Sequence, residues 1–291
     1  MAEILLPVLS VTLISGLLAI IISLAEKRLN NYGTCKINVN DGSKELEVEG
    51  GSSLLATLAG QKIFIPSACG GKATCGLCKL QVLEGAGPLL PTEEPYLTEK
   101  ERKENYRLAC QIKVKGDMRI AIPEELFNIR EYITTVESLT DLTHDIKEVR
   151  LKLPEDETIK FKAGQFMQFY SKPYDKVKEE VFRAYSISSA PSDDHHVEFC
   201  IRRVPDGICT TYVHDHLKEG DEVRLSGPYG EFYLRGDCDE LVMIAGGSGL
   251  APIRSLLLYV FENDLPFKKV TFYFGAREQR DLYYLEELAA L

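Results

Sequence analysis

Four of the eight cysteines in this 291-residue chain have a spacing that restricts what their part of the chain can fold into. Cys69, Cys75 and Cys78 are separated by five and two residues, and Cys110 follows after 31 more. Four thiolates can ligate a 2Fe-2S cluster, and the plant-type spacing has four residues where this chain has five. The segment 67–78, SACGGKATCGLC, consists mostly of small residues, which let the backbone wrap closely around a cluster. The spacing therefore predicts a 2Fe-2S cluster held by these four cysteines.

Structural zinc and disulfides are the alternative uses of these cysteines. Zinc sites usually pair two C-x2-C knuckles or include histidine, whereas this chain has one such knuckle and no histidine before His144. Disulfides are rare on the cytoplasmic side of a membrane, where we expect this part of the chain to lie. The other four cysteines show no ligand spacing, and we expect each to be buried as a small hydrophobic side chain: Cys35, Cys200, Cys209 and Cys238.

The N-terminal residues 4–25 form a run of 22 residues without a charged side chain, which Glu26, Lys27 and Arg28 end. A hydrocarbon core about 30 Å thick needs about 20 helical residues. A cleaved signal peptide would begin with basic residues and have a shorter apolar run, and a core helix would show a polar face. We therefore predict a transmembrane helix over residues 4–25. The basic residues after it place the rest of the chain in the cytoplasm.

Hydropathy and turn patterns divide the remaining residues into three parts. Residues 34–123 alternate short strands with one helix and the cysteine loop. Residues 129–236 show the period-two pattern of antiparallel strands. Residues 237–291 begin with a buried strand, a glycine turn and a helix, which is the start of a βαβ unit. The chain is predicted to be multidomain, and its net charge of −10 argues against a nucleic-acid partner.

A candidate flavin motif, R-x-Y-S, stands at the end of a β segment and contains Arg183, Tyr185 and Ser186. A guanidinium matches a pyrophosphate with forked donors. A tyrosine ring can stack on an isoalloxazine, and a serine hydroxyl can hydrogen-bond a flavin ring nitrogen and tune it. We interpret Tyr185 and Ser186 as the catalytic residues, beside the reacting ring. In isolation such a tyrosine is more often a core residue, and such an arginine a solvated charge.

A glycine turn between a buried strand and a helix contains Gly246, Gly247 and Gly249, and the helix begins near Pro252. Glycines allow close approach to a pyrophosphate, and a helix N-terminus favours its charge. The run reads G-G-x-G-x-x-P and not G-x-G-x-x-G, so a tight turn without a ligand is the alternative. We interpret it as a nicotinamide-nucleotide site. Arg277, on the following strand, leaves NADH and NADPH both open.

An apolar N-terminal run followed by CGGKATCGLC and RLAC resembles the F subunit of the bacterial sodium-pumping NADH:quinone reductases. The later segments resemble the ferredoxin–NADP reductase superfamily. The resemblance implies an α+β ferredoxin-like (β-grasp) domain, an antiparallel β-barrel flavin domain and part of an α/β nucleotide-binding domain after the membrane helix. It assigns them to residues 34–123, 129–236 and 237–291, with residues 4–25 as the helix.

The same resemblance implies FAD as the flavin and NADH as the nucleotide. In the family, a Gly-x-x-Ser/Thr segment opens a short helix that meets the flavin phosphate; here the corresponding residues are Gly207, Thr210 and Thr211. Arg277 then ends the strand that lies under the adenosine ribose. The two strands after residue 237 are fewer than such a nucleotide domain contains, so we expect a C-terminally truncated fragment.

The function implied is the electron-input subunit of a membrane-bound, Na+-transporting NADH:quinone oxidoreductase. A hydride passes from NADH to FAD, and single electrons pass to the 2Fe-2S cluster and onward to other membrane subunits, with quinone as the eventual acceptor. The expected location is the bacterial cytoplasmic (inner) membrane, with the soluble domains facing the cytoplasm. Two alternatives stay open: the reductase component of a bacterial oxygenase, and a membrane-tethered ferredoxin-type electron carrier.

Overall fold

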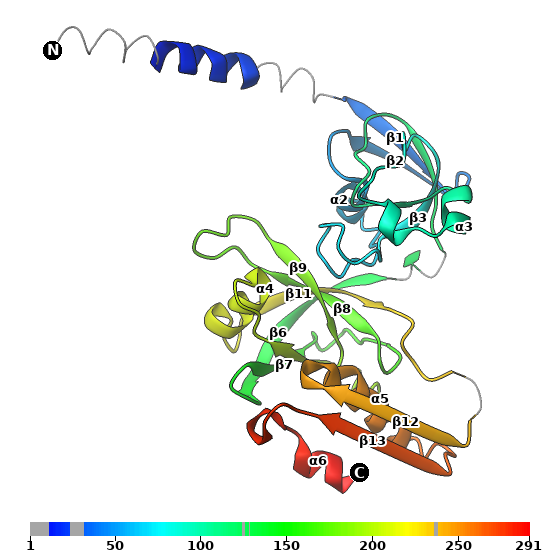
Figure 1. Ribbon diagram of the computed structural model, residues 1–291, viewed down its shortest axis with the longest axis vertical. Helices are drawn as coiled ribbons and strands as arrows, with labels where there is room; N and C mark the ends of the chain where they lie inside the picture. The colour runs from blue at the N-terminus through cyan, green and yellow to red at the C-terminus, as the bar shows by residue number, and fades with distance from the viewer. Residues whose placement is uncertain (1–11, 24–31, 124–125, 128, 236–237) are drawn as a thin grey trace, which may run out of the picture. The chain divides into compact units, whose positions relative to one another are not determined.

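The computed structural model describes residues 12–23, 32–123, 126–127, 129–235 and 238–291 (Figure 1). The chain divides into two compact units. The first comprises residues up to Gln61 together with Lys79–Ile122, and the second comprises Lys62–Cys78 together with Pro123–Leu291. The cysteine loop thus belongs to the second unit, although it is flanked in sequence by the first.

The first unit is built on a five-stranded sheet with strand order β2-β1-β5-β3-β4. Strands β1 and β5 are parallel, and the other pairs are antiparallel. The strands are β1 (Thr34–Val39), β2 (Lys44–Glu49), β3 (Lys79–Glu84), β4 (Tyr106–Leu108) and β5 (Met118–Ala121). Every second residue of β1 is buried, as expected of a strand with one face on the core.

Helices cover and extend this sheet. Helix α2 (Leu54–Gly60) begins where the Ser53 side chain accepts a hydrogen bond from the Ala56 N–H, and its leucines are buried. The short elements η1 (Glu94–Tyr96) and α3 (Glu99–Lys103) precede β4. Helix α3 begins with a reciprocal capping box between Thr98 and Glu101.

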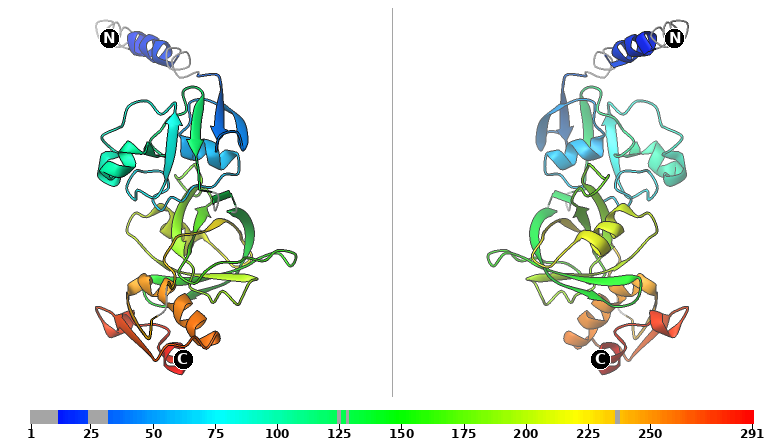
Figure 2. Two further views of the ribbon diagram at one scale, coloured as in Figure 1. Left: turned by 90° about the vertical axis from the view of Figure 1, so that its right-hand side faces the viewer. Right: turned by 90° about the vertical axis from the view of Figure 1, so that its left-hand side faces the viewer.

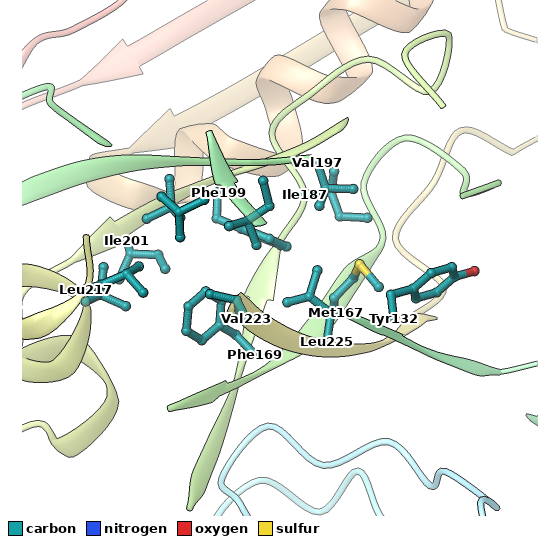
Figure 3. Close-up of a cluster of buried hydrophobic side chains, with 14 of the residues drawn as sticks. Tyr132, Met167, Phe169, Ile187, Val197, Phe199, Ile201, Leu217, Val223 and Leu225 are labelled. Carbon is teal, nitrogen blue, oxygen red and sulfur yellow. The ribbon is translucent and has the colours of Figure 1, made fainter. Parts of the chain in front are cut away.

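The second unit contains a six-stranded antiparallel sheet with strand order β10-β7-β6-β11-β8-β9. An isolated bridge between Ile187 and Phe199 links the segment after β9 to β10. The curved sheet encloses a core of buried side chains, among them the fully buried Phe169, Phe199 and Leu225 (Figure 3). The strands are β6 (Arg130–Asp141), β7 (Ile146–Lys152), β8 (Phe166–Ser171), β9 (Val181–Ser186), β10 (His196–Arg202) and β11 (Glu222–Tyr229).

Two short helical elements, α4 (Ile208–Thr211) and η3 (Tyr212–His216), connect β10 to β11. The parallel strands β12 (Glu240–Gly246) and β13 (Lys269–Gly275) follow and pair with each other. Between them lie η4 (Gly247–Gly249) and α5 (Leu250–Glu262), and after them η5 (Gln279–Asp281) and α6 (Leu285–Ala290). Helix α5 packs on the strand pair through a shared apolar cluster, and Figure 2 shows it alongside them. This is the expected start of a βαβ unit.

Of the predicted membrane segment 4–25, residues 4–11 and 24–25 lie outside the described residues. Residues 12–23 are helical, and their apolar side chains are exposed. Within the described part of the chain, no helix combines the length and the hydrophobicity that a membrane crossing requires.

The expected burial of the remaining cysteines is confirmed for Cys35, Cys200 and Cys209 and is wrong for Cys238, which is exposed. Cys238 lies in the connection that precedes β12, and connecting segments run over the surface, where no sheet or helix covers them.

Candidate cofactor sites

The cysteine loop holds Cys69 and Cys75 with their sulfurs 3.4 Å apart. The backbone N–H of Lys72 donates to the Cys69 sulfur at 3.2 Å. Burial raises the pKa of the Cys69 thiol, but hydrogen bonds from Thr74, Cys75 and Lys72 outweigh this effect and lower the pKa to about 7. The loop therefore favours a thiolate, which is the form that ligates metal.

The small residues of this loop are required by its backbone. Gly70, Gly71, Ala73 and Gly76 all have positive φ, which larger side chains rarely adopt. Gly70 also approaches a neighbouring strand closely: a Cβ atom there would lie 2.4 Å from Nη1 of Arg183 and 2.8 Å from the Phe182 carbonyl oxygen.

Cys110 lies in the first unit, two residues after the end of β4. A buried ion pair holds the end of β4: Arg107 Nη2 lies 2.6 Å from Glu93 Oε2, and Leu108 N–H donates to Glu93 Oε1 at 2.9 Å. The Ala109 carbonyl oxygen accepts a hydrogen bond from Leu55 at the start of α2. The backbone leading to Cys110 is therefore fixed on both sides.

Cys69 and Cys75 fit one half of a 2Fe-2S cluster, in which each iron takes two cysteine sulfurs. Cys69 and Cys75 already form such a pair, an N–H donor faces one sulfur, and no disulfide joins any of the eight cysteines. Among the described residues, no three His, Cys, Asp or Glu side chains gather around a single ion position. The structure thus brings together Cys69 and Cys75, places Cys78 at the end of the same loop, and assigns Cys110 to the other unit.

The R-x-Y-S motif opens onto a cavity of about 490 Å³ in the second unit. Arg183 and Tyr185 line it, and so do Gly207 and Thr210 from the segment that begins α4. Ser186 and Thr211 are not among the lining residues. Other lining residues are Lys72 of the cysteine loop, Arg202 at the end of β10, and Ser248 of the glycine turn.

The Tyr185 hydroxyl is the feature of this cavity that most indicates a bound group. It is buried beside the Cys209 thiol and makes no hydrogen bond of normal geometry with a described residue. Burial and the neighbouring Cys209 thiol raise the Tyr185 pKa far above its ordinary value, so the hydroxyl stays protonated. An unpartnered buried hydroxyl is costly, and a bound flavin would supply the missing partner.

The Gly207 turn is built around the side chain of Thr210. A Cβ atom at position 207 would lie 2.5 Å from Thr210 Oγ1, so glycine is needed there. Thr210 Oγ1 accepts from Val204 N–H at 3.2 Å and donates to the Gly207 carbonyl oxygen at 3.1 Å. Its hydroxyl thus shapes the turn, and the backbone N–H groups of α4 are the donors that the turn presents.

The glycine turn opens onto a second cavity, of about 380 Å³. Gly246, Gly247 and Arg277 line it together, whereas Gly249 and Pro252 do not. Gly247 has φ +53°, and its carbonyl oxygen accepts from the Tyr283 hydroxyl at 2.8 Å. Gly249 precedes the first residue of α5, and Pro252 lies in its first turn, where a missing N–H costs nothing.

Sequence reasoning missed Arg202, which lines both cavities. Its Nε donates to Asp145 Oδ2 at 2.7 Å, so the side chain is held between the flavin motif and the glycine turn. A second missed residue is Gln168, a buried side chain of β8 that donates to the Ile65 carbonyl oxygen at 3.2 Å and so holds the cysteine loop. Both side chains contact residues that are far away in the sequence, and no local motif reveals such contacts.

Comparison with known proteins gives each part of the chain a counterpart. Three family models match: a 2Fe-2S iron-sulfur cluster binding domain over residues 37–115, an oxidoreductase FAD-binding domain over 134–233, and an oxidoreductase NAD-binding domain over 243–291. The F subunit of the Na(+)-translocating NADH-quinone reductase of Histophilus somni is 35% identical over 325 residues, covering 99% of this chain and 80% of the relative. Its counterpart in Neisseria meningitidis is 37% identical over 324 residues, with the same coverage. The chain belongs to this family of F subunits.

Two solved reductases are similar to most of the chain. The Amycolatopsis cytochrome P450 reductase GcoB has a TM-score of 0.65 and 30% identity, covering 88% of this chain and 77% of that one. The ferredoxin reductase in carbazole 1,9a-dioxygenase has a TM-score of 0.62 and 27% identity, covering 88% and 76%. The predicted cofactor domains are therefore confirmed, and the chain is an NAD(P)H-dependent flavin and iron–sulfur oxidoreductase that transfers electrons from NAD(P)H through FAD to a 2Fe-2S cluster.

Proposed function

We propose that this chain is the electron-input subunit of a membrane-bound, Na+-translocating NADH:quinone oxidoreductase. The observation that carries the proposal is the 35–37% identity to curated F subunits over 99% of the chain. NADH is the donor, and other membrane subunits of the complex receive the electrons, with quinone reduced elsewhere in the assembly. Bound FAD would supply a group that accepts two electrons as a hydride and releases them singly. The 2Fe-2S cluster would carry one electron at a time.

In this proposal the residues of the flavin cavity bind and orient the cofactor. Arg183 presents forked donors to the pyrophosphate, and the ring of Tyr185 packs on the isoalloxazine while its hydroxyl gains a partner. Ser186 donates from the end of β9 to a flavin ring nitrogen. The turn formed by Gly207, Thr210 and Thr211 offers backbone N–H groups to flavin phosphate.

The second cavity is proposed to hold the nicotinamide nucleotide. Gly246, Gly247 and Gly249 allow close approach of its pyrophosphate, and the N-terminus of α5 near Pro252 favours the negative charge. Arg277 contacts the adenosine side. Arg202 lines this cavity and the flavin cavity, so the two ligands are expected to meet beside it.

The proposed cluster ligands are Cys69, Cys75, Cys78 and Cys110. The proposed domain boundaries are a membrane helix over 4–25, a ferredoxin-type domain over 34–123, a flavin domain over 129–236 and a nucleotide-binding segment over 237–291. The helix crosses the bacterial cytoplasmic membrane once, and Lys27 and Arg28 keep the following domains in the cytoplasm.

Complementation tests this role. In a strain lacking the protein, membranes should lose NADH-driven quinone reduction and regain it when the gene is supplied again. The variant Cys110→Ser should fail to restore it. A version lacking residues 1–29 should remain in the soluble fraction after lysis and also fail.

The structural similarity to oxygenase reductases favours one alternative, the reductase component of a soluble oxygenase. That alternative predicts the opposite results. Full-length protein would leave the membrane in high salt without detergent, and quinone reduction would be unaffected by its loss.

A further inference from the structure

The side chain of Gln111 lies against the sulfur of the neighbouring Cys110. Gln111 Nε2 is 3.6 Å from Cys110 Sγ and 3.4 Å from the Cys110 carbonyl oxygen. At the other end of the amide, the Thr92 hydroxyl donates to Gln111 Oε1 at 2.9 Å. The backbone is fixed as well, because Gln111 N–H donates to the Leu108 carbonyl oxygen at 2.8 Å.

The chemistry of these neighbours decides which end of the amide faces the sulfur. A carbonyl oxygen and a cysteine sulfur are both acceptors, so the end that faces them must be the NH2 group. The oxygen then points to Thr92, whose hydroxyl can rotate to donate. The reversed amide would place an oxygen lone pair against two acceptors. Thr92 therefore secures the orientation in which Gln111 is a donor to sulfur.

We propose that Gln111 is a positioning residue that raises the reduction potential of the 2Fe-2S cluster through its hydrogen bond to the Cys110 sulfur, with Thr92 holding the amide in place. The inference rests on the proposed function in one respect, namely that Cys110 is a cluster ligand. Reduction adds negative charge that the ligand sulfurs share, and an N–H donor stabilises the sulfur more in the reduced state. Removing the donor therefore makes the cluster harder to reduce.

The test is an EPR-monitored redox titration of the full chain in detergent. Gln111→Met keeps the length and shape of the side chain and removes the donor. Its midpoint potential should fall by an amount equal to about a tenfold change in the reduction equilibrium, which is 59 mV for one electron. Gln111→Glu, which places a carboxylate oxygen against the sulfur, should lower the potential further.

The matched control is Gln81→Met, in the same unit. The Gln81 amide donates to the Glu104 carbonyl oxygen at 3.0 Å and not to a cysteine, so this variant should keep the wild-type potential. Thr92→Val should lower the potential less than Gln111→Met does, and Thr92→Ser, which keeps the hydroxyl, should restore it.

Equal potentials in Gln111→Met, Gln81→Met and the unchanged protein would overturn the inference. If Gln111→Met assembles no cluster, the comparison of Thr92→Val with Thr92→Ser decides: equal potentials overturn the inference, and a lower potential in Thr92→Val alone supports it. Absence of a 2Fe-2S signal in the unchanged protein would contradict the proposed function and not the role of Gln111.

Discussion

The buried ion pair between Glu93 and Arg107 offers the sharpest test of how the first unit is held together. Glu93 is fully buried, and the Arg107 side chain is 8% exposed. Glu93 Oε1 accepts from Leu108 N–H and Arg107 Nε, and Oε2 accepts from Leu90 N–H and Arg107 Nη2. Both oxygens are therefore surrounded by donors.

Glu93→Gln should destabilise this unit by about 3–5 kcal/mol. Whichever way the new amide points, its NH2 group meets donors, and Arg107 keeps a buried charge without a counter-ion. Arg107 is further fixed by the Gly87 and Pro88 carbonyl oxygens, so it cannot readily turn to solvent. With a urea m-value of about 2 kcal/mol/M, the midpoint should fall by about 1.5–2.5 M.

The assay is urea unfolding of the anaerobic full chain, followed by the visible circular dichroism of the cluster. Glu104→Gln is the matched control, because the Lys100–Glu104 pair is 3.8 Å long and both side chains are well exposed. It should leave the midpoint unchanged. A midpoint for Glu93→Gln equal to that of Glu104→Gln would refute the reasoning.

Three other measurements test the pH response of this ion pair, the cysteine loop and the flavin cavity. Burial raises the Glu93 pKa, but hydrogen bonds from Arg107 and backbone N–H groups outweigh it and hold the pKa below its usual value. The ionised Glu93 therefore stabilises the fold at pH values above its unfolded pKa of about 4.3. This stabilisation is lost as the pH falls through the folded pKa, so the unfolding midpoints of wild type and Glu93→Gln should converge in acid. Gly70→Ala adds a Cβ 2.4 Å from Arg183 Nη1 at a residue with φ +66°, so it should disturb both the cysteine loop and the proposed flavin contact of Arg183. In stopped-flow spectroscopy, flavin reduction by NADH and cluster reduction should both be slower than in the unchanged protein, and unchanged rates for both steps would contradict this. Tyr185→Phe removes the unpartnered hydroxyl, so the free energy of unfolding of flavin-free protein, measured by thermal unfolding, should rise by about 1 kcal/mol. FAD should bind this variant more weakly, and an unchanged FAD affinity would exclude a flavin contact at that hydroxyl.

Much of the cysteine loop could be predicted from the sequence, because ligand spacing and small residues are local properties. The loop needs four residues at positive φ, and the chain supplies glycine or alanine at each. The grouping of Cys69 with Cys75 follows from that backbone. By contrast, the contact between the Gln111 side-chain amide and the Cys110 sulfur depends on how the Gln111 side chain is oriented. The Thr92 hydroxyl holds that orientation, and no sequence pattern encodes it.

The R-x-Y-S motif predicted three residues of the flavin cavity, and two of them line it. Arg183 and Tyr185 are two residues apart in β9 and line the cavity together, whereas Ser186 is next to Tyr185 and does not. Ala184, between Arg183 and Tyr185, lines the cavity as well, so the cavity follows the strand from Arg183 to Tyr185 and ends before Ser186. The hydrogen bond from Ser186 to a flavin ring nitrogen therefore remains a proposal that the cavity lining does not support directly.

Arg202 and Gln168 could not be found from the sequence because their roles arise from strand order. Arg202 ends β10, which pairs with β7, and Asp145 stands just before β7. Gln168 lies in β8 between β9 and β11, and it meets the cysteine loop about a hundred residues away in sequence. Only the folded sheet brings these residues together.

The most direct test of the central claim is an anaerobic titration of the full chain with NADH, followed by visible absorption and low-temperature EPR on the same samples. We predict that the flavin absorption bleaches and that the signal of a reduced 2Fe-2S cluster appears. In Cys110→Ser the flavin should still bleach, and the cluster signal should be absent. A cluster that dithionite reduces but NADH does not would contradict electron transfer from NADH through the flavin to the cluster and would favour a simple electron carrier.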